Sequence, residues 1–294
     1  MATLRTIRKR IITVQKTSKI TKAMKMVSAA KLRRAQEAIE NLRPYATAVE
    51  GVVASLAARS EKLESPFLQP RAVKHRLFVP ITSDRGLCGG FNNTLNRRLE
   101  YDLEARREAG ETFSLFPIGR KALEYFRKRG YTIRDQITDY QRSVDHAFAV
   151  TLAGKLIDAF LSGEVDEVHL VYNVFVSAMT QRYACKKILP IEVTPLPEGS
   201  AEEEGEATRV DYIYEPKREA LLSWLLPRFV ETEVFRALLE SLAGEHGARM
   251  TAMDSATNNA VEMIDRLTLQ MNRARQAAIT SELMDIVNGA EAIK

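Results

Sequence analysis

The chain has 294 residues, a net charge of +5 and an apolar share of 45%, which fits about two globular domains. No run of 18 apolar residues predicts a transmembrane helix, and basic residues interrupt every place where a secretory signal could have its apolar core. The two cysteines and four histidines are scattered without metal-ligand spacing, so we expect no metal site, no cofactor and no disulfide framework.

Positive charge is concentrated at the N-terminus. Residues 1–36 hold eleven lysines and arginines and no acidic residue, so the rest of the chain must carry a net charge of −6. A segment this basic repels itself unless an acidic surface lies nearby. It resembles a transit peptide in being basic and amphipathic, but the pattern continues far beyond a cleavable length.

Residues 4–56 are predicted to form one long helix. Positions spaced alternately by three and four residues from Leu4 to Leu56 are apolar at both ends of this segment but polar in its middle. Between residues 18 and 28 the apolar positions are Ile20, Met24 and Val27, which predicts a stutter in the helix pairing. Pro44 predicts a kink, and Pro66 and Pro70 mark a linker after the helix.

From residue 75 the pattern changes to short strands alternating with helices, which predicts a parallel or mixed sheet covered by helices. The predicted strands are residues 77–81, 112–118 and 167–176, and the predicted helices are 93–107, 121–128 and 144–161. Cys185 falls in a further region with strand character. The glutamate-rich segment 195–208 is predicted to be a solvated loop.

The final stretch, residues 228–294, contains no proline and predicts a helix of about 60 residues, or roughly 90 Å. A helix so long must project beyond any core that the chain could build. Its apolar residues recur at spacings typical of a helix that pairs with another helix: Leu239, Ala243, Met250, Met253, Ala260, Ile264, Leu267, Met271, Ala274 and Ala278.

The predicted fold class is therefore α/β, with a long antiparallel coiled coil of N- and C-terminal helices and an inserted Rossmann-like α/β domain. Residues 1–65 and 213–294 would form the coiled-coil shaft, and residues 70–212 the central domain. The alanine-rich seam would let the two helices approach closely.

The glycine-rich turn at residues 83–92 is the best candidate for a phosphate-binding loop, because it follows a strand and precedes a helix. Its spacing, with Gly86, Gly89 and Gly90, matches neither GxGxxG nor a P-loop. We therefore interpret these glycines as residues of a tight turn that needs positive φ or close backbone approach.

The basic N-terminal helix also suggests a nucleic-acid-binding protein or a standalone coiled-coil adaptor. Against nucleic acid, the charge overlies an apolar seam, and no aromatic residue precedes Tyr45 to stack on bases. A mechanical or scaffolding function is favoured, and the adaptor stays open as the alternative.

Four motifs resemble the gamma subunit family of F-type ATP synthases. They are ITKAMKMVSAAK at residues 20–31, SDRGLCGGFN at 83–92, RMTAMDSATNNA at 249–260 and NRARQAAIT at 272–280. The resemblance runs from about Leu4 to Ile293, essentially the whole chain.

This resemblance implies a rotor without chemistry of its own. The shaft would turn inside a ring of three alpha and three beta subunits, and the central domain would sit with the epsilon subunit on the c-subunit ring. Proton flow through that ring would drive ATP synthesis on beta. The delta subunit would belong to the same complex. The resemblance implies a peripheral membrane protein on the cytoplasmic face of the bacterial inner membrane, with neither nucleic-acid binding nor direct membrane insertion.

The resemblance also implies partner-binding residues. Arg275 and Gln276 would hydrogen-bond a loop of one beta subunit, with Thr280 and Glu282 one turn further along. Met24 and Lys25 would pass the acidic lever segment of beta. The photosynthetic branch has an inserted segment with a regulatory cysteine pair, which this sequence lacks, so we expect the respiratory bacterial type without thiol regulation.

Overall fold

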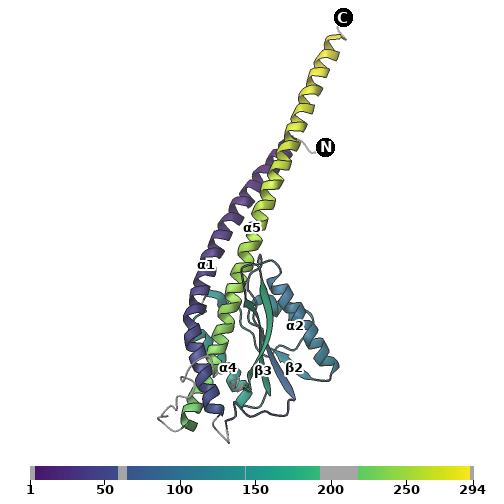
Figure 1. The fold of residues 1–294 in the computed structure, drawn as a ribbon. Coiled ribbons are helices and arrows are strands. Elements are labelled where there is room, and N and C mark those ends of the chain that lie inside the picture. Colours follow the sequence, from purple (N-terminus) through teal and green to yellow (C-terminus); the bar gives the residue numbers. More distant parts are fainter. Residues whose placement is uncertain (1–3, 59–64, 143, 193–217, 292–294) are drawn as a thin grey trace, which may run out of the picture. The chain divides into compact units, whose positions relative to one another are not determined.

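The computed structural model describes residues 4–58, 65–142, 144–192 and 218–291 (Figure 1). Two long helices, α1 (Leu4–Ala58) and α5 (Arg218–Glu291), begin and end this part of the chain. The chain divides into two compact units, which are described separately. The first comprises Met1–Ala30 and Arg249–Lys294, and the second Lys31–Ala248.

The second unit contains a four-stranded sheet in the order β2-β1-β3-β4. Strands β1 (His75–Pro80), β2 (Thr112–Leu115) and β3 (Glu167–Phe175) are parallel, and β4 (Gln181–Leu189) adds an antiparallel edge. Parallel neighbours need helical crossovers, which are supplied by α2 (Phe91–Glu108), α3 (Arg120–Lys128) and α4 (His146–Leu161).

Alternating side chains of β1 face opposite sides of the sheet, as the strand's period of two requires. Phe78 packs with Leu95 and Leu99 of α2 and with Phe126 of α3. Leu77 and Val79 pack on the other side, in a larger core that includes α4 and the nearby parts of α1 and α5. The sheet is thus covered by helices on both faces, as predicted.

The second unit also holds one end of each long helix. Val49 and Val53 of α1 are buried in the same core as Val230 and Val234 of α5 and the sheet residue Val79. Burying a large aliphatic side chain contributes about 1.5–3 kcal/mol. Both helices are therefore anchored to the sheet through the larger core.

The first unit consists of the remaining parts of α1 and α5, packed together. The hydroxyls of Thr21 and Thr257 lie 2.7 Å apart, and Lys25 Nζ lies 2.6 Å from Asp254 Oδ1. Residue numbers rise along α1 as they fall along α5 in these contacts, so the pairing is antiparallel. The predicted seam positions of α5 that face α1 in this unit are all buried or half-buried, which confirms the seam there: Met250, Met253, Ala260, Ile264, Leu267, Met271 and Ala274.

The predicted stutter is wrong. Ile20 and Val27 are 59% and 58% exposed, whereas Thr21 and Ser28 are 8% and 3% exposed. The seam of α1 therefore keeps its regular spacing and admits polar side chains. Thr21 is accommodated because its hydroxyl lies within hydrogen-bonding distance of both Ser18 O and Thr257 Oγ1.

The other predicted elements are confirmed with shifted boundaries. Helix α1 continues through Pro44, and α5 begins ten residues before the predicted position 228 and includes Pro227. Strand β2 ends at Leu115 rather than 118. The glutamate-rich segment 195–208, residues 59–64 at the predicted end of the first helix, and residues 213–217 lie outside the described residues.

Gly119 supports a specific prediction about the sheet. Its φ is +97°, and a Cβ there would overlap the backbone carbonyl of Thr82. We expect Gly119→Ala to lower the free energy of unfolding by about 3 kcal/mol or more, measured by urea unfolding. Gly130→Ala is the control, because its φ is +75° but its Cβ would meet open space; it should cost only about 1–2 kcal/mol. Equal costs would contradict the predicted overlap.

Candidate functional site

The predicted partner-binding residues of α5 share one exposed segment of the first unit. Arg275, Gln276, Thr280 and Glu282 are all exposed. The Thr280 hydroxyl donates to the backbone carbonyl of Gln276 (3.0 Å), and residues four and seven apart lie on one side of a helix. The arginine, amide and carboxylate side chains are thus available to a partner.

The antiparallel register explains why this segment is exposed. Counting along both helices from the Thr21–Thr257 contact places Leu4, the first residue of α1, level with Ala274. From Arg275 onward α5 has no described part of α1 beside it. Five large apolar side chains of this segment, which we call the unpaired tip, are exposed: Ile279, Leu283, Met284, Ile286 and Val287.

The predicted residues of α1 are in a different situation. Met24 is half-buried, and the Lys25 ammonium already forms an ion pair with Asp254 (2.6 Å). The Lys25 and Asp254 side chains are 42% and 47% exposed, so this pair contributes only about 0–1 kcal/mol. An ammonium has three N–H donors, which leaves Lys25 able to contact a partner as well.

Sequence reasoning missed a groove between the two helices of the first unit. Its volume is about 390 Å³, and it is lined by Lys22, Lys25, Met26, Ala29, Asp254, Thr257 and Asn258. The signal was present in the sequence, because polar residues occupy seam positions where the regular spacing of α1 continues. Hydrophobicity alone favours Ile20, Met24 and Val27 in this stretch, and so predicts a change of spacing instead.

Most of the hydrogen bonds of the glycine-rich turn join residues of the turn itself, although Asp84 Oδ2 is buried without a partner among the described residues. The side-chain oxygen of Asn92, Oδ1, accepts from Ser83 N (2.9 Å). The side-chain nitrogen, Nδ2, donates to Ser83 Oγ (2.7 Å) and to Cys88 Sγ (3.2 Å). Gly89 has φ +57°, as expected for a tight turn, whereas Gly86 and Gly90 are not in the left-handed region. Asp84 accepts from Arg120 N at the start of α3 (3.0 Å). This network builds a turn around Asn92 and does not present a row of amides to a phosphate.

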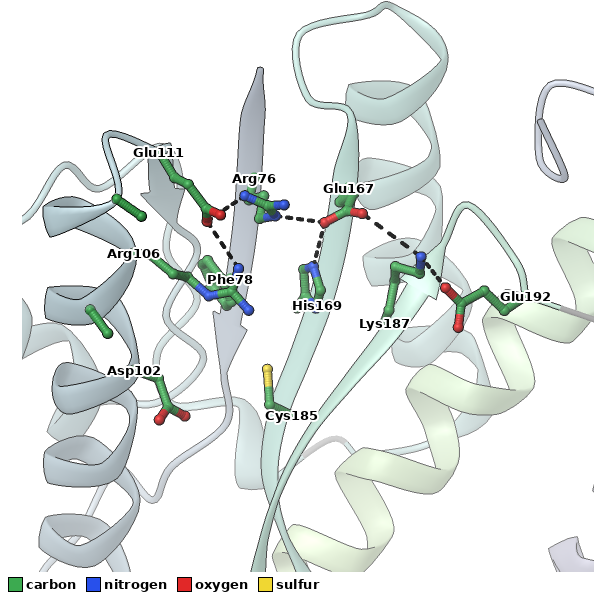
Figure 2. Close-up of a pocket in the computed structure, with 12 residues that line it drawn as sticks. Arg76, Phe78, Asp102, Arg106, Glu111, Glu167, His169, Cys185, Lys187 and Glu192 are labelled. Atoms are coloured by element: carbon green, nitrogen blue, oxygen red, sulfur yellow. Dashed lines mark hydrogen bonds and ion pairs between the residues drawn. The ribbon is translucent and has the colours of Figure 1, made fainter. Parts of the chain in front are cut away.

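A second hollow, of about 770 Å³, lies between α2 and strands β1, β3 and β4. Figure 2 shows a chain of ion pairs along it, centred on Arg76 and Glu167. Arg76 Nε donates to Glu167 (2.7 Å), and Arg76 Nη1 pairs with Glu111. The Glu111 carboxylate also accepts from Arg106 Nη1 (3.0 Å). The lining holds three cationic side chains and four carboxylates, so the hollow offers no surplus positive charge to an anionic ligand.

His169 is the most strongly buried titratable group of this hollow. It stacks on Phe78 with ring centroids 5.0 Å apart, and its Nε2 lies 3.0 Å from Glu167. Burial lowers the pKa of His169, and the ion pair with Glu167 only partly opposes this. Arg76 and Arg106 lower it further. Partial burial also raises the pKa of the nearby Cys185 thiol to about 11, so this thiol is protonated at neutral pH, although the residue is exposed at the surface.

Among the described residues no group of three His, Cys, Asp or Glu side chains could hold a metal ion, and no helix is long and apolar enough to cross a membrane. Both cysteines are free thiols. The features that remain for function are the paired helices, their basic surface and the unpaired tip.

Comparison with known proteins assigns the chain to a family. A sequence model of the family described as ATP synthase matches residues 3–293, and an ATP synthase gamma chain from Anaeromyxobacter sp. (strain Fw109-5) is 51% identical, with all of both chains covered. The chain belongs to the ATP synthase gamma chain family. The gamma chain of Geobacter sp. (strain M21) is 49% identical over the full length of both chains.

Solved structures of more distant proteins agree with the fold. The chain resembles one from the central stalk and c-ring of Tetrahymena thermophila mitochondrial ATP synthase, at 26% identity and a TM-score of 0.57, covering 81% of this chain and 99% of that one. A chain from Euglena gracilis mitochondrial ATP synthase is 21% identical with a TM-score of 0.66, covering 99% of this chain and 94% of that one; this likeness concerns the fold alone.

Family membership decides between the interpretations left open by the sequence. The chain is the central-stalk rotor of an F-type ATP synthase rather than a standalone adaptor. It is a non-catalytic subunit of a membrane-associated complex that includes F1 and a c-ring. The relatives at about 50% identity are bacterial, as the sequence motifs suggested.

His169 supports a prediction about pH. Because its pKa is lower in the folded chain than in the unfolded chain, the unfolded state binds more protons as pH falls from about 7 to 5, and stability decreases. Burial alone would raise the pKa of Glu167, but its contacts with His169 and Arg76 outweigh burial and lower it. The contribution of Glu167 to the stability of the folded chain is lost only below pH 4.5. We expect His169→Gln to remove much of the decrease between pH 7 and 5, measured by urea unfolding at both values. An unchanged decrease would contradict this assignment.

Proposed function

We propose that the chain couples proton-driven rotation of the c ring to conformational cycling of the catalytic beta subunits, in ATP synthesis or hydrolysis. The unpaired tip carries this proposal, because it is a single helix with exposed apolar residues and no described helix beside it. Large exposed apolar surfaces mark interaction sites. A ring of three alpha and three beta subunits around one copy of this chain would supply the surrounding surface.

An apolar tip suits rotation for a physical reason. Contacts made by Leu283, Ile286 and Val287 are non-directional, so a turning helix exchanges one such contact for another at little cost. A directed hydrogen bond would have to break at each step and would leave a group unpaired. We therefore propose that the shaft makes its few polar contacts with the ring along the side of the helix, rather than at its apolar end.

Arg275 and Gln276 are the proposed side contacts to a loop of one beta subunit. Both side chains are exposed at the point where the helix pairing ends. A guanidinium can donate two parallel hydrogen bonds to a carboxylate, and the Gln276 amide can both donate and accept. Thr280 and Glu282 would lie against the same partner surface one turn further along.

Met24 and Lys25 are the proposed contacts to the acidic lever segment of beta. Met24 lies between Ile20 and Val27 at helical spacing, and these two neighbours are largely exposed. Exposed lysines, including Lys19 and Lys22, flank this apolar stripe. A surface of this kind suits an amphipathic, acidic partner.

The remaining assignments extend the same proposal. Residues 1–65 and 213–294 would form the shaft, and the central domain, residues 70–212, would contact the epsilon subunit and the c ring. The delta subunit would be part of the same complex. The complex would lie on the cytoplasmic face of the bacterial inner membrane, which the bacterial origin of the relatives supports.

We expect Arg275→Ala to weaken coupling without preventing assembly. A hydrogen bond to a charged group is worth about 1.5–3 kcal/mol, so the affected step should slow by about tenfold or more. The measurement is ATP synthesis, relative to ATP hydrolysis, in membrane vesicles that contain the complete complex.

Arg273→Ala is the matched control for Arg275→Ala. Arg273 is equally exposed and two residues away on the same helix, so its side chain points to a different side. Its loss changes the charge by the same amount and should leave coupling near the original level. Unchanged synthesis in the Arg275 variant, or equal losses in both variants, would refute the proposed contact.

A further inference from the structure

The carboxyl ends of β1 and β3 lie where an open α/β sheet usually binds its ligand. The two strands are parallel neighbours, but the chain continues from β1 to β2 on one side and from β3 to β4 on the other. Ligands of open α/β sheets bind outside the carboxyl ends of the strands at such a reversal of direction. We call this position the switch point.

One side of α5 lies against the switch point. Ser241 Oγ donates to the backbone carbonyl of Ile81, directly after β1 (3.4 Å). One turn further along α5, the Glu245 carboxylate accepts a hydrogen bond from the Gln141 amide. Residues three and four apart share a side of a helix, so both contacts lie on one side of α5.

Two glycines on the same side of α5 make the closest contacts. A Cβ at Gly244 would lie 3.1 Å from Cε2 of Phe91, the first residue of α2. A Cβ at Gly247 would lie 3.0 Å from Cα of Ala178, in the loop between β3 and β4. An ordinary contact between carbon atoms is about 3.5–4.0 Å. The helix therefore has no side chain at the two places where the loops approach it.

These loops are also tied to the strand ends by hydrogen bonds of their own. Asn173 Nδ2 donates to the backbone carbonyl of Phe91 (3.2 Å), which joins β3 to the start of α2. Gln181 Nε2 donates to the backbone carbonyls of Ser177 (3.1 Å) and Ala178 (3.2 Å), which closes the loop between β3 and β4. The loops therefore meet α5 as ordered parts of the sheet.

The loop contacts extend an attachment that the larger core begins. That core holds α5 through Val230, Val234 and Leu238. Gly247 lies about 13 Å beyond Leu238 along the helix axis. The contacts at the switch point therefore add to the core and do not replace it.

We propose that α5 takes the place of a ligand at the switch point, and that Gly244 and Gly247 are positioning residues that leave room for the loops to close on the helix. The second unit thereby holds its own helix with the loops that a ligand-binding sheet would use to hold a small molecule. The inference concerns this unit alone and does not depend on the proposed contacts to beta.

Hydrogen–deuterium exchange of the full-length chain tests the proposal. In Gly247→Ala the new Cβ meets backbone atoms of Ala178, so the loop itself must move. We expect the amides of residues 176–180 to exchange about tenfold faster than in the parent chain. Gly154→Ala is the control, because it makes the same change within a helix but its Cβ would meet open space. It should leave the exchange of this loop unchanged.

A second pair of changes tests the contact at Gly244 by urea unfolding. The Cβ of Gly244→Ala would meet the Phe91 ring, and Phe91→Leu removes the ring atom that it meets. Changes at residues in contact are not additive, so Gly244→Ala should shift the urea midpoint downward less in the Phe91→Leu background than in the parent chain. The shift caused by Gly154→Ala should be the same in both backgrounds. This cycle carries the test if Gly247→Ala does not fold.

Three results would overturn the proposal. One is unchanged exchange of residues 176–180 in a folded Gly247→Ala chain, or an equal change in Gly154→Ala. Another is full additivity of Gly244→Ala and Phe91→Leu. The third comes from adding ATP or NAD to the parent chain: we expect no change in the exchange of residues 83–92 and 176–180, and protection of either loop would show that the switch point is open to a ligand.

Discussion

The structure depends on the antiparallel pairing of the two ends of one chain. Alanine and methionine on α5 allow the helices to lie close together, and the valines at the base of both helices anchor them in the larger core beside the sheet. Because Leu4, the first described residue, lies level with Ala274, no described part of α1 lies beside the last part of α5. Under the proposed function, an exposed single-helix segment is the part of the chain that would contact the partner subunits.

Much of this arrangement was predictable from the sequence, because helix pairing and strand alternation leave strong periodic signals. The seam of α5 could be identified residue by residue. The seam of α1 could not, since hydrophobicity alone selects Ile20 and Val27, whereas the structure buries Thr21 and Ser28. The reason is a partner more than 200 residues away: Thr257 gives the Thr21 hydroxyl a hydrogen bond that no local pattern reveals.

The same limitation applies to the sheet. The ion pairs of Arg76 with Glu111 and Glu167 join residues far apart in sequence, and they depend on the strand order, which periodicity does not specify. The predicted contacts at Arg275 and Met24 came from a family resemblance. The structure adds that Arg275 lies just beyond the first described residue of α1 and that the Lys25 ammonium already has a partner on the other long helix.

Reconstitution with partner subunits tests the rotor assignment most directly. The purified chain would be mixed with alpha and beta subunits, and ATP hydrolysis would be recorded together with the mass of the complex. The account predicts a stable complex of three alpha, three beta and one copy of this chain, with hydrolysis that depends on the chain. Failure to form this complex, with alpha and beta subunits that assemble normally around an established gamma subunit, would contradict it.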